Sequence, residues 1–182
     1  MNAGPHLVLI GLMGAGKTTV GQNCARGLGR AFVDTDAVVE ANAGETVPEI
    51  FAREGEAGFR ARERAALVDA LAAPEPLVIA CGGGAILDPE NRRTVRDRGF
   101  VVWLQASPEV LAERVERDGV DARPMLAGGS PTITLTRLAA ARAGAYAAAA
   151  DAVVSTVERS VEAVAELVLD ALAASDRDEA SA

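Results

Sequence analysis

The chain has 182 residues, of which 49% are hydrophobic and 3% aromatic, and its formal net charge is -8 at pH 7. This length allows one domain with a buried core, and the acidic balance argues against general binding of nucleic acid. An anionic ligand must therefore be met by positive charge that is gathered locally.

The amino-terminal half alternates short apolar runs with helical patterns. Apolar runs at residues 7–10, 31–33 and 77–81 predict buried strands, and Pro74 and Pro76 come just before the third of them. Helical patterns follow the first two runs, and a break at residues 54–55 separates the last two of them. The predicted helices span residues 17–28, 37–43, 47–53 and 56–73.

The carboxyl-terminal half repeats this alternation. Ser107 followed by Pro108 is typical of a helix start, with the serine as the capping residue. Residues 118–131 are rich in glycine, aspartate and proline and predict a mobile lid. The other expected elements are helices at 89–98, 108–117, 132–150 and 161–173, and strands at 100–104 and 152–154.

Strands that alternate with helices indicate an α/β fold, here a five-stranded parallel sheet with helices on both faces. We expect a single domain over residues 1–174 and a flexible tail over 175–182. The chain starts without a basic segment or a long apolar run, so we expect a cytoplasmic protein without a membrane span. Cys24, Cys81 and Trp103 are expected in the core, and His6 at the surface or a sheet edge.

The motif GLMGAGKT, from Gly11 to Thr18, fits the phosphate-binding pattern G-x-x-x-x-G-K-[ST]. It follows a predicted strand and opens a predicted helix, which is the context that this pattern requires. Backbone N–H groups wrap phosphate oxygens there, lysine reaches the β- and γ-phosphates, and a hydroxyl binds Mg²⁺. The expected nucleotide-binding residues are Gly14, Ala15, Gly16, Lys17, Thr18 and Thr19.

Acidic residues follow the second predicted strand, and glycines follow the third. Asp34 and Asp36 come at the end of the second, where they can hold Mg²⁺ and a substrate hydroxyl, or merely cap the next helix. The third strand runs into Gly82-Gly83-Gly84, where many phosphate-handling proteins have a metal-binding aspartate. Glycines at this position allow close approach of backbone to a ligand.

The segment FAREGEAGFRARE, residues 51–63, mixes aromatic residues, glycines and charges. An arginine from this helix can point into a ligand cleft, but spacing alone does not choose among Arg53, Arg60, Arg62 and Arg64. The alternative is a solvated helix face stabilised by ion pairs three and four residues apart.

These motifs together resemble the shikimate kinase family. The resemblance rests on GLMGAGKT, DTD, FAREGEAGFRARE, CGGG, ARPML in the predicted lid, and Arg142 with Tyr146, in that order. It covers residues 7–154, nearly the whole chain. One departure lies between Arg142 and Tyr146, where the family often has proline and leucine and this chain has Ala143, Gly144 and Ala145.

The resemblance implies a role for each matching residue on the acceptor side. Asp36 matches an aspartate that binds shikimate hydroxyls beside the one that is phosphorylated. Arg60 and Arg142 match two arginines that bind the carboxylate of shikimate. The substrate-side glycines match Gly82, Gly83 and Gly84.

On the nucleotide side, the resemblance implies that Asp34 and Thr18 hold Mg²⁺ and that Arg117 packs on the adenine. Arg123 matches a lid arginine that reaches the transferring phosphate, so Lys17, Asp36 and Arg123 are the expected catalytic residues. The implied activity is ATP-dependent phosphorylation of shikimate by a monomer that binds neither nucleic acid nor membrane. The alternatives are a kinase of the same fold for gluconate, a nucleoside monophosphate or an aminocyclitol, and a non-catalytic nucleotide switch.

Overall fold

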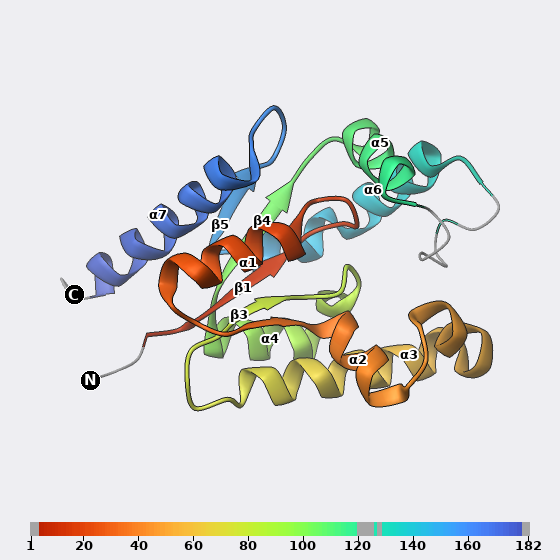
Figure 1. Cartoon of the computed structure of the whole chain (residues 1–182), viewed down its shortest axis with the longest axis horizontal. Coiled ribbons are helices and arrows are strands. Elements are labelled where there is room, and N and C mark those ends of the chain that lie inside the picture. Colours follow the sequence, from red (N-terminus) through yellow and green to blue (C-terminus); the bar gives the residue numbers. More distant parts are fainter. Residues whose placement is uncertain (1–3, 120–125, 127–128, 180–182) are drawn as a thin grey trace.

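The computed structural model describes residues 4–119, 126 and 129–179 and has a five-stranded, all-parallel sheet at its centre (Figure 1). The strand order is β2-β3-β1-β4-β5. The five parallel strands confirm the α/β fold that the alternation of strands and helices predicts. The strands are β1 (His6–Ile10), β2 (Phe32–Asp34), β3 (Val78–Ala80), β4 (Gly99–Gln105) and β5 (Ala152–Ser155).

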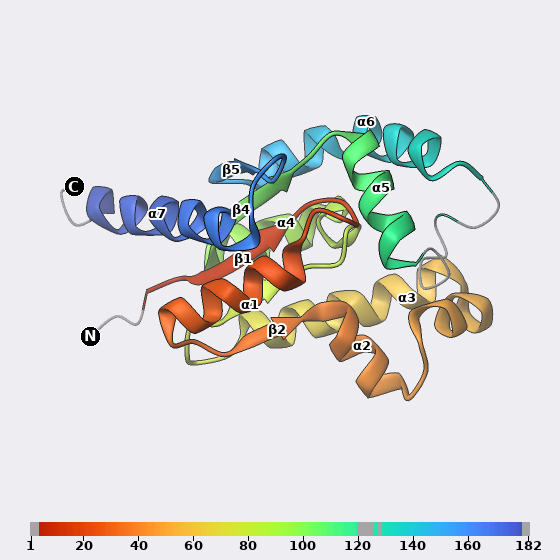
Figure 2. The same ribbon diagram turned by 45° about the horizontal axis from the view of Figure 1, so that its top comes forward.

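Helices cover both faces of this sheet. Helices α1 and α7 pack on each other over one face, and α4 contacts both α3 and α6 on the other (Figures 1 and 2). The described helices are α1 (Lys17–Leu28), α2 (Thr35–Ala43), α3 (Val47–Leu71), α4 (Pro89–Arg98), α5 (Pro108–Asp118), α6 (Pro131–Ala149), α7 (Val161–Glu179) and the single 3-10 turn η1 (Ala85–Leu87).

Strand β1 lies in the middle of the sheet and is buried along its whole length. Its Leu7 pairs in register with Val78 of β3 on one side and Phe100 of β4 on the other. Parallel strands of apolar residues, covered on both faces, have this uniform burial. The register brings the carboxyl ends of β1, β2 and β3 to one edge, so the segments that follow them meet there.

Local signals set the helix boundaries much as the sequence predicts. Ser107 caps α5 by accepting a hydrogen bond from the Val110 N–H, and Asp88 caps α4 in the same way. The predicted break between two helices lies at Gly55, which has a φ of 69° inside α3. Only glycine adopts this conformation at low cost, so α3 is bent there.

A small second core holds α2 and α3 together. Val39, Ile50, Phe59 and Ala66 are buried against one another and are separate from the main cluster under the sheet. The pair of helices that carries Asp36 and the arginines of the FAREGEAGFRARE segment is therefore a packed unit of its own, attached beside the carboxyl ends of the strands.

Two features differ from the expectations. Helix α7 continues to Glu179, beyond the predicted end at residue 173 and into the predicted tail, because residues 174–179 contain neither glycine nor proline. His6 is 7% exposed in the central strand rather than at a surface or edge. Its Nδ1 accepts a hydrogen bond of 3.0 Å from the Leu77 N–H.

Other expectations agree with the structure. Cys24 and Cys81 are buried free thiols, and Trp103 packs against the main core. Among the described helices, none combines the length and the apolar character needed to cross a bilayer. Most of the predicted lid, including Arg123, lies outside the described residues.

The buried His6 makes stability depend on pH. Burial lowers the pKa of His6 below its ordinary 6.5, and Arg30 and Arg98 act in the same direction. The unfolded chain therefore takes up the proton more readily, so this contribution to stability is present above pH 6.5 and decreases as the pH falls below it. We expect His6→Asn, which retains an acceptor for Leu77, to flatten the dependence of unfolding free energy on pH between 5 and 7. An identical slope in urea titrations of both proteins would contradict this.

Candidate functional site

A cavity of about 760 Å³ opens at the carboxyl edge of the sheet. Its walls come from the phosphate loop, the α2–α3 unit, the glycine turn after β3, and α5 and α6. It brings together nearly every site residue that the sequence predicts within the described part of the chain. Those that line it are Gly14, Ala15, Gly16, Lys17, Thr18, Thr19, Asp34, Asp36, Arg60, Gly83, Gly84, Arg117 and Arg142, and Gly82 lies just behind them.

The phosphate loop between β1 and α1 is shaped by its glycines. Gly11 and Gly14 have φ angles of 143° and 80°, and a Cβ on Gly11 would lie 2.5 Å from the Leu104 carbonyl. The Nζ of Lys17 donates to the carbonyls of Gly11 at 2.9 Å and Leu12 at 3.1 Å, which holds it across the loop. No side chain of the described residues caps the amino terminus of α1, so its N–H groups are available to an anion.

Thr18 and Asp34 form the part of the site that fits a divalent cation. The Thr18 hydroxyl donates to Asp34 Oδ2 at 2.7 Å. The other oxygen of Asp34 accepts from the Asp36 and Ala37 N–H groups and caps α2, which confirms the capping interpretation, whereas the metal-binding interpretation stays a prediction. The described residues contain no group of three acidic, histidine or cysteine ligands. A hard ion with few protein ligands and many from phosphate and water is typical of Mg²⁺.

Asp36 and Glu63 each have a buried oxygen that lacks a partner among the described residues. Neither Asp36 Oδ1 nor Glu63 Oε1 accepts a hydrogen bond from them, and both atoms lie beside Gly82. Burial, and next the charge of Glu63, raise the pKa of Asp36 to about 6. Burial raises the pKa of Glu63 as well, against the opposing charge of Arg60. A ligand that donates hydrogen bonds to these oxygens would relieve an unfavourable arrangement.

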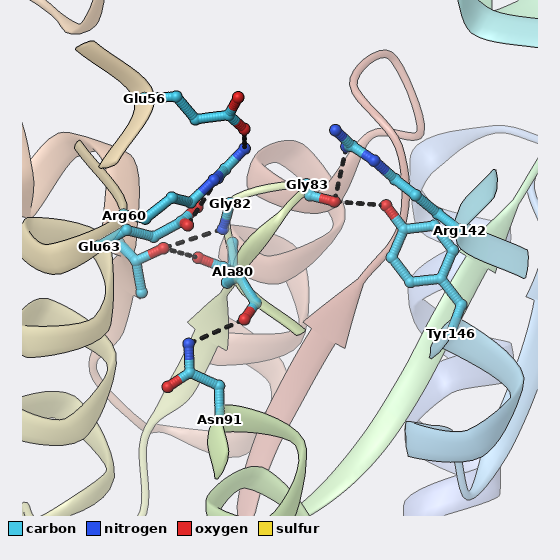
Figure 3. A network of polar contacts seen from close by, with 11 residues as sticks. Glu56, Arg60, Glu63, Ala80, Gly82, Gly83, Asn91, Arg142 and Tyr146 are labelled. Atoms are coloured by element: carbon cyan, nitrogen blue, oxygen red, sulfur yellow. Dashed lines mark hydrogen bonds and ion pairs between the residues drawn. The ribbon is translucent and has the colours of Figure 1, made fainter. Parts of the chain in front are cut away.

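Arg60 is the arginine of α3 that faces the cavity. Its Nη1 contacts Glu63 Oε2 at 2.6 Å and its Nη2 contacts Glu56 Oε1 at 3.3 Å (Figure 3). The other three candidates form ion pairs elsewhere: Arg53 with Glu45, Arg62 with Glu54, and Arg64 with Asp88 and Glu90. Glu63 was missed by sequence reasoning because an acid three residues after an arginine also fits an ordinary solvated helix face.

Each glycine of the turn after β3 lies against a different polar group. A Cβ on Gly82 would collide with Glu63 and lie 2.6 Å from Asp36 Oδ1, and one on Gly84 would overlap the Arg60 guanidinium. A Cβ on Gly83 would find only ordinary contacts, the nearest at 3.5 Å. The turn is held in place by a hydrogen bond of 2.9 Å from the Gly82 N–H to the Thr35 hydroxyl.

Arg142 and Tyr146 reach the same turn from α6. Both donate to the Gly83 carbonyl oxygen, Arg142 Nη1 at 2.9 Å and the Tyr146 hydroxyl at 2.6 Å (Figure 3). Arg142 is 4% exposed and makes no ion pair with a described acid within 4 Å, so its charge is available to a ligand.

The nucleotide end of the cavity contains an arginine that sequence reasoning missed. Arg114 donates to the Gly14 carbonyl at 3.2 Å and to the Thr156 hydroxyl and carbonyl, both at 2.8 Å. It thereby ties α5 and the segment after β5 to the phosphate loop. The predicted Arg117 lines the same end, but its side chain is 73% exposed and, within the described part of the chain, forms an ion pair only with its neighbour Asp118. One helical turn separates the two arginines, and only the fold shows which one turns inward.

Comparison with known proteins identifies the family. A model described as "Shikimate kinase" matches residues 13–173. The chain belongs to the shikimate kinase family. It is 51% identical to the shikimate kinase of Symbiobacterium thermophilum over 92% of this chain and 95% of that protein, and 44% identical to that of Bordetella pertussis over 95% and 82%.

Solved structures agree with this assignment. The shikimate kinase from Acinetobacter baumannii in complex with shikimate superposes with a TM-score of 0.91 at 37% identity, over 96% of both chains. A gluconokinase from Sinorhizobium meliloti, at 18% identity and a TM-score of 0.62, shares the fold. Shikimate kinases thus resemble this chain in both sequence and structure.

The glycine turn supplies a matched pair of substitutions. We expect Gly84→Ala to displace the Arg60 guanidinium and to weaken binding of a carboxylate acceptor by about tenfold or more, the scale of a lost charged hydrogen bond. Gly83→Ala meets no close neighbour and should change acceptor KM by less than about threefold. Steady-state kinetics on both variants check this, and equal effects would show that backbone freedom rather than Arg60 governs the turn.

We expect Asp36 to be required for activity and to lower the stability of the folded protein. Its pKa of about 6 in the folded state lies above the ordinary 3.8, so the buried carboxylate opposes folding increasingly as the pH rises from 3.8 to 6, and the full cost above pH 6 is on the order of 2–3 kcal/mol. We expect Asp36→Asn to abolish turnover and raise the melting temperature by several degrees at pH 8, a gain that shrinks toward pH 4. Thermal melts at both pH values test this, and a variant that is less stable at pH 8 would contradict it.

Proposed function

We infer that this chain transfers the γ-phosphoryl group of ATP to a hydroxyl of shikimate, giving shikimate 3-phosphate and ADP. The observation that carries this inference is the convergence of Arg60, Arg142 and Asp36 on one glycine turn, across a cavity from a phosphate loop. This arrangement suits an acceptor that has both a carboxylate and hydroxyls. Membership of the shikimate kinase family supports the same activity.

The acceptor half of the cavity, around the glycine turn at residues 82–84, suits a small anionic ring. Two forked guanidinium groups provide charge-assisted donors for a carboxylate. They supply locally the positive charge that a protein with a net charge of -8 lacks overall. The unpartnered oxygens of Asp36 and Glu63 accept hydrogen bonds from ring hydroxyls. Bare glycines let the ring approach the backbone closely enough for both sets of contacts.

The transfer step needs alignment and charge neutralisation more than covalent help. Lys17 and the N–H groups at the start of α1 bind the phosphates, and Asp36 orients the attacking hydroxyl and accepts its proton. Thr18 and Asp34 fit Mg²⁺, which when bound would neutralise charge on the phosphates. Arg123, the proposed lid arginine, lies outside the described residues and stays a prediction.

The proposal extends to the nucleotide end and to the assembly. Gly14, Ala15, Gly16 and Thr19 contact the phosphates, and the adenine lies near Arg117 and Arg114.

We also propose that a monomer acts in the cytoplasm, as the sequence predicts. A cyclitol or aminocyclitol has no carboxylate and would leave Arg60 and Arg142 without an anion to bind, which argues against that alternative acceptor.

The first experiment is ADP release by the purified protein with ATP and Mg²⁺, with shikimate, gluconate, AMP or a neutral cyclitol as acceptor. We expect stimulation by shikimate alone. The matched control is Lys17→Ala prepared in the same way, which reports any contaminating kinase and should be inactive. Tight ATP binding without stimulation by any acceptor would instead support a nucleotide switch.

A further inference from the structure

The Gly83 carbonyl oxygen accepts two hydrogen bonds, and both come from α6. Arg142 and Tyr146 stand four residues apart and therefore project from the same face of the helix. A carbonyl oxygen has two lone pairs, so these donors satisfy it fully. Figure 3 shows the two side chains converging on this one atom.

The two donors differ in what else they can do. Arg142 has five N–H groups and its charge is not paired with a described acid, whereas the Tyr146 hydroxyl has one proton and donates it to Gly83. Tyr146 is 1% exposed, and its ring lies 5.4 Å from that of Trp103, which fixes its position. Burial raises the pKa of Tyr146 to about 12, so it remains a donor at any assay pH.

The bond to Gly83 restrains Arg142. A two-pronged contact with a carboxylate requires the guanidinium plane to face both oxygens, and a guanidinium tied through Nη1 to Gly83 is not free to turn. Turning would remove one donor from the Gly83 carbonyl. The Gly83 residue is half-buried, and a carbonyl that is partly shielded from water loses free energy when a donor leaves it, so the ease of turning depends on whether another donor stays behind.

We propose that Tyr146 is a positioning residue that keeps the Gly83 carbonyl satisfied while Arg142 turns from Gly83 to the carboxylate of the acceptor. This rests on the proposed function, because it takes Arg142 as a carboxylate-binding residue. Tyr146 itself does not touch the substrate. Its hydroxyl lowers the cost of binding by holding the glycine turn in both states of the arginine.

The test is Tyr146→Phe, which keeps the buried ring and removes only the hydroxyl. We expect the KM for shikimate to rise roughly tenfold, the KM for ATP to change less than twofold, and kcat to stay within about twofold. Trp103→Phe is the matched control, since it alters the same aromatic contact but leaves the bonds to Gly83 intact. An unchanged shikimate KM in Tyr146→Phe, or equal rises for both substrates, would overturn the proposal.

Two further experiments distinguish a positioning role of Tyr146 from a general loosening of the structure around it. With shikimate methyl ester, which offers no charged carboxylate, Tyr146→Phe should have little effect on KM. In an Arg142→Ala background, Tyr146→Phe should raise KM no further, because no arginine leaves Gly83. Additive effects in that background would overturn the proposal.

The fluorescence of Trp103 gives an independent measure of shikimate affinity, since Trp103 is the only tryptophan of the sequence and contacts Tyr146. Shikimate titrations without ATP should show the same tenfold loss of affinity in Tyr146→Phe. If the wild-type protein neither turns over nor binds shikimate, the proposed function fails, and this inference with it. Wild-type turnover with an unchanged Tyr146→Phe overturns this inference alone.

Discussion

The lack of side chains on Gly82, Gly83 and Gly84 is the constraint on which the acceptor half of the cavity depends. Strand β3 ends there, and carboxylates from α2 and α3, a guanidinium from α3 and two donors from α6 all reach the turn. A Cβ on the first or third glycine would occupy the space that these polar groups fill. The turn thus takes the place of a strand-end acid, and Asp34 from the neighbouring strand pairs with Thr18 instead.

The charges around this turn are arranged for a ligand rather than for stability. Glu63 is 1% exposed, and one of its oxygens has no hydrogen-bond partner in the described ranges even though Arg60 binds the other. A fold selected only for stability would pair or remove such groups, since unsatisfied buried acids raise its free energy. Their presence in a cleft, with raised pKa values, is typical of functional sites. An acidic protein obtains its local positive field from Arg60, Arg142 and Lys17, on three different helices.

The sequence predicted the features that depend on local patterns and missed those that depend on the direction in which a side chain points. Strands, caps and the break at Gly55 are local and were correct, as was the phosphate loop between β1 and α1. Periodicity could not show that Arg114 turns inward where Arg117 does not, or that Glu63 is buried beside Arg60. His6 was misjudged because its neighbours Gly4 and Pro5 suggested a terminus, whereas pairing with both β3 and β4 makes β1 central.

Gly83 also joins the two halves of the cavity. It lies between α6 and the phosphate loop: a Cβ there would be 3.5 Å from both the Arg142 guanidinium and the Gly11 carbonyl, the same carbonyl to which Lys17 donates. The missing side chain of Gly83 therefore lets the turn lie close to the loop that holds Lys17. The strands that precede the two segments are also joined, because the Cys81 N–H donates to the Leu9 carbonyl at 3.0 Å. The sheet thus holds the turn and the phosphate loop in a fixed relation, which is what the alignment of two reacting groups requires.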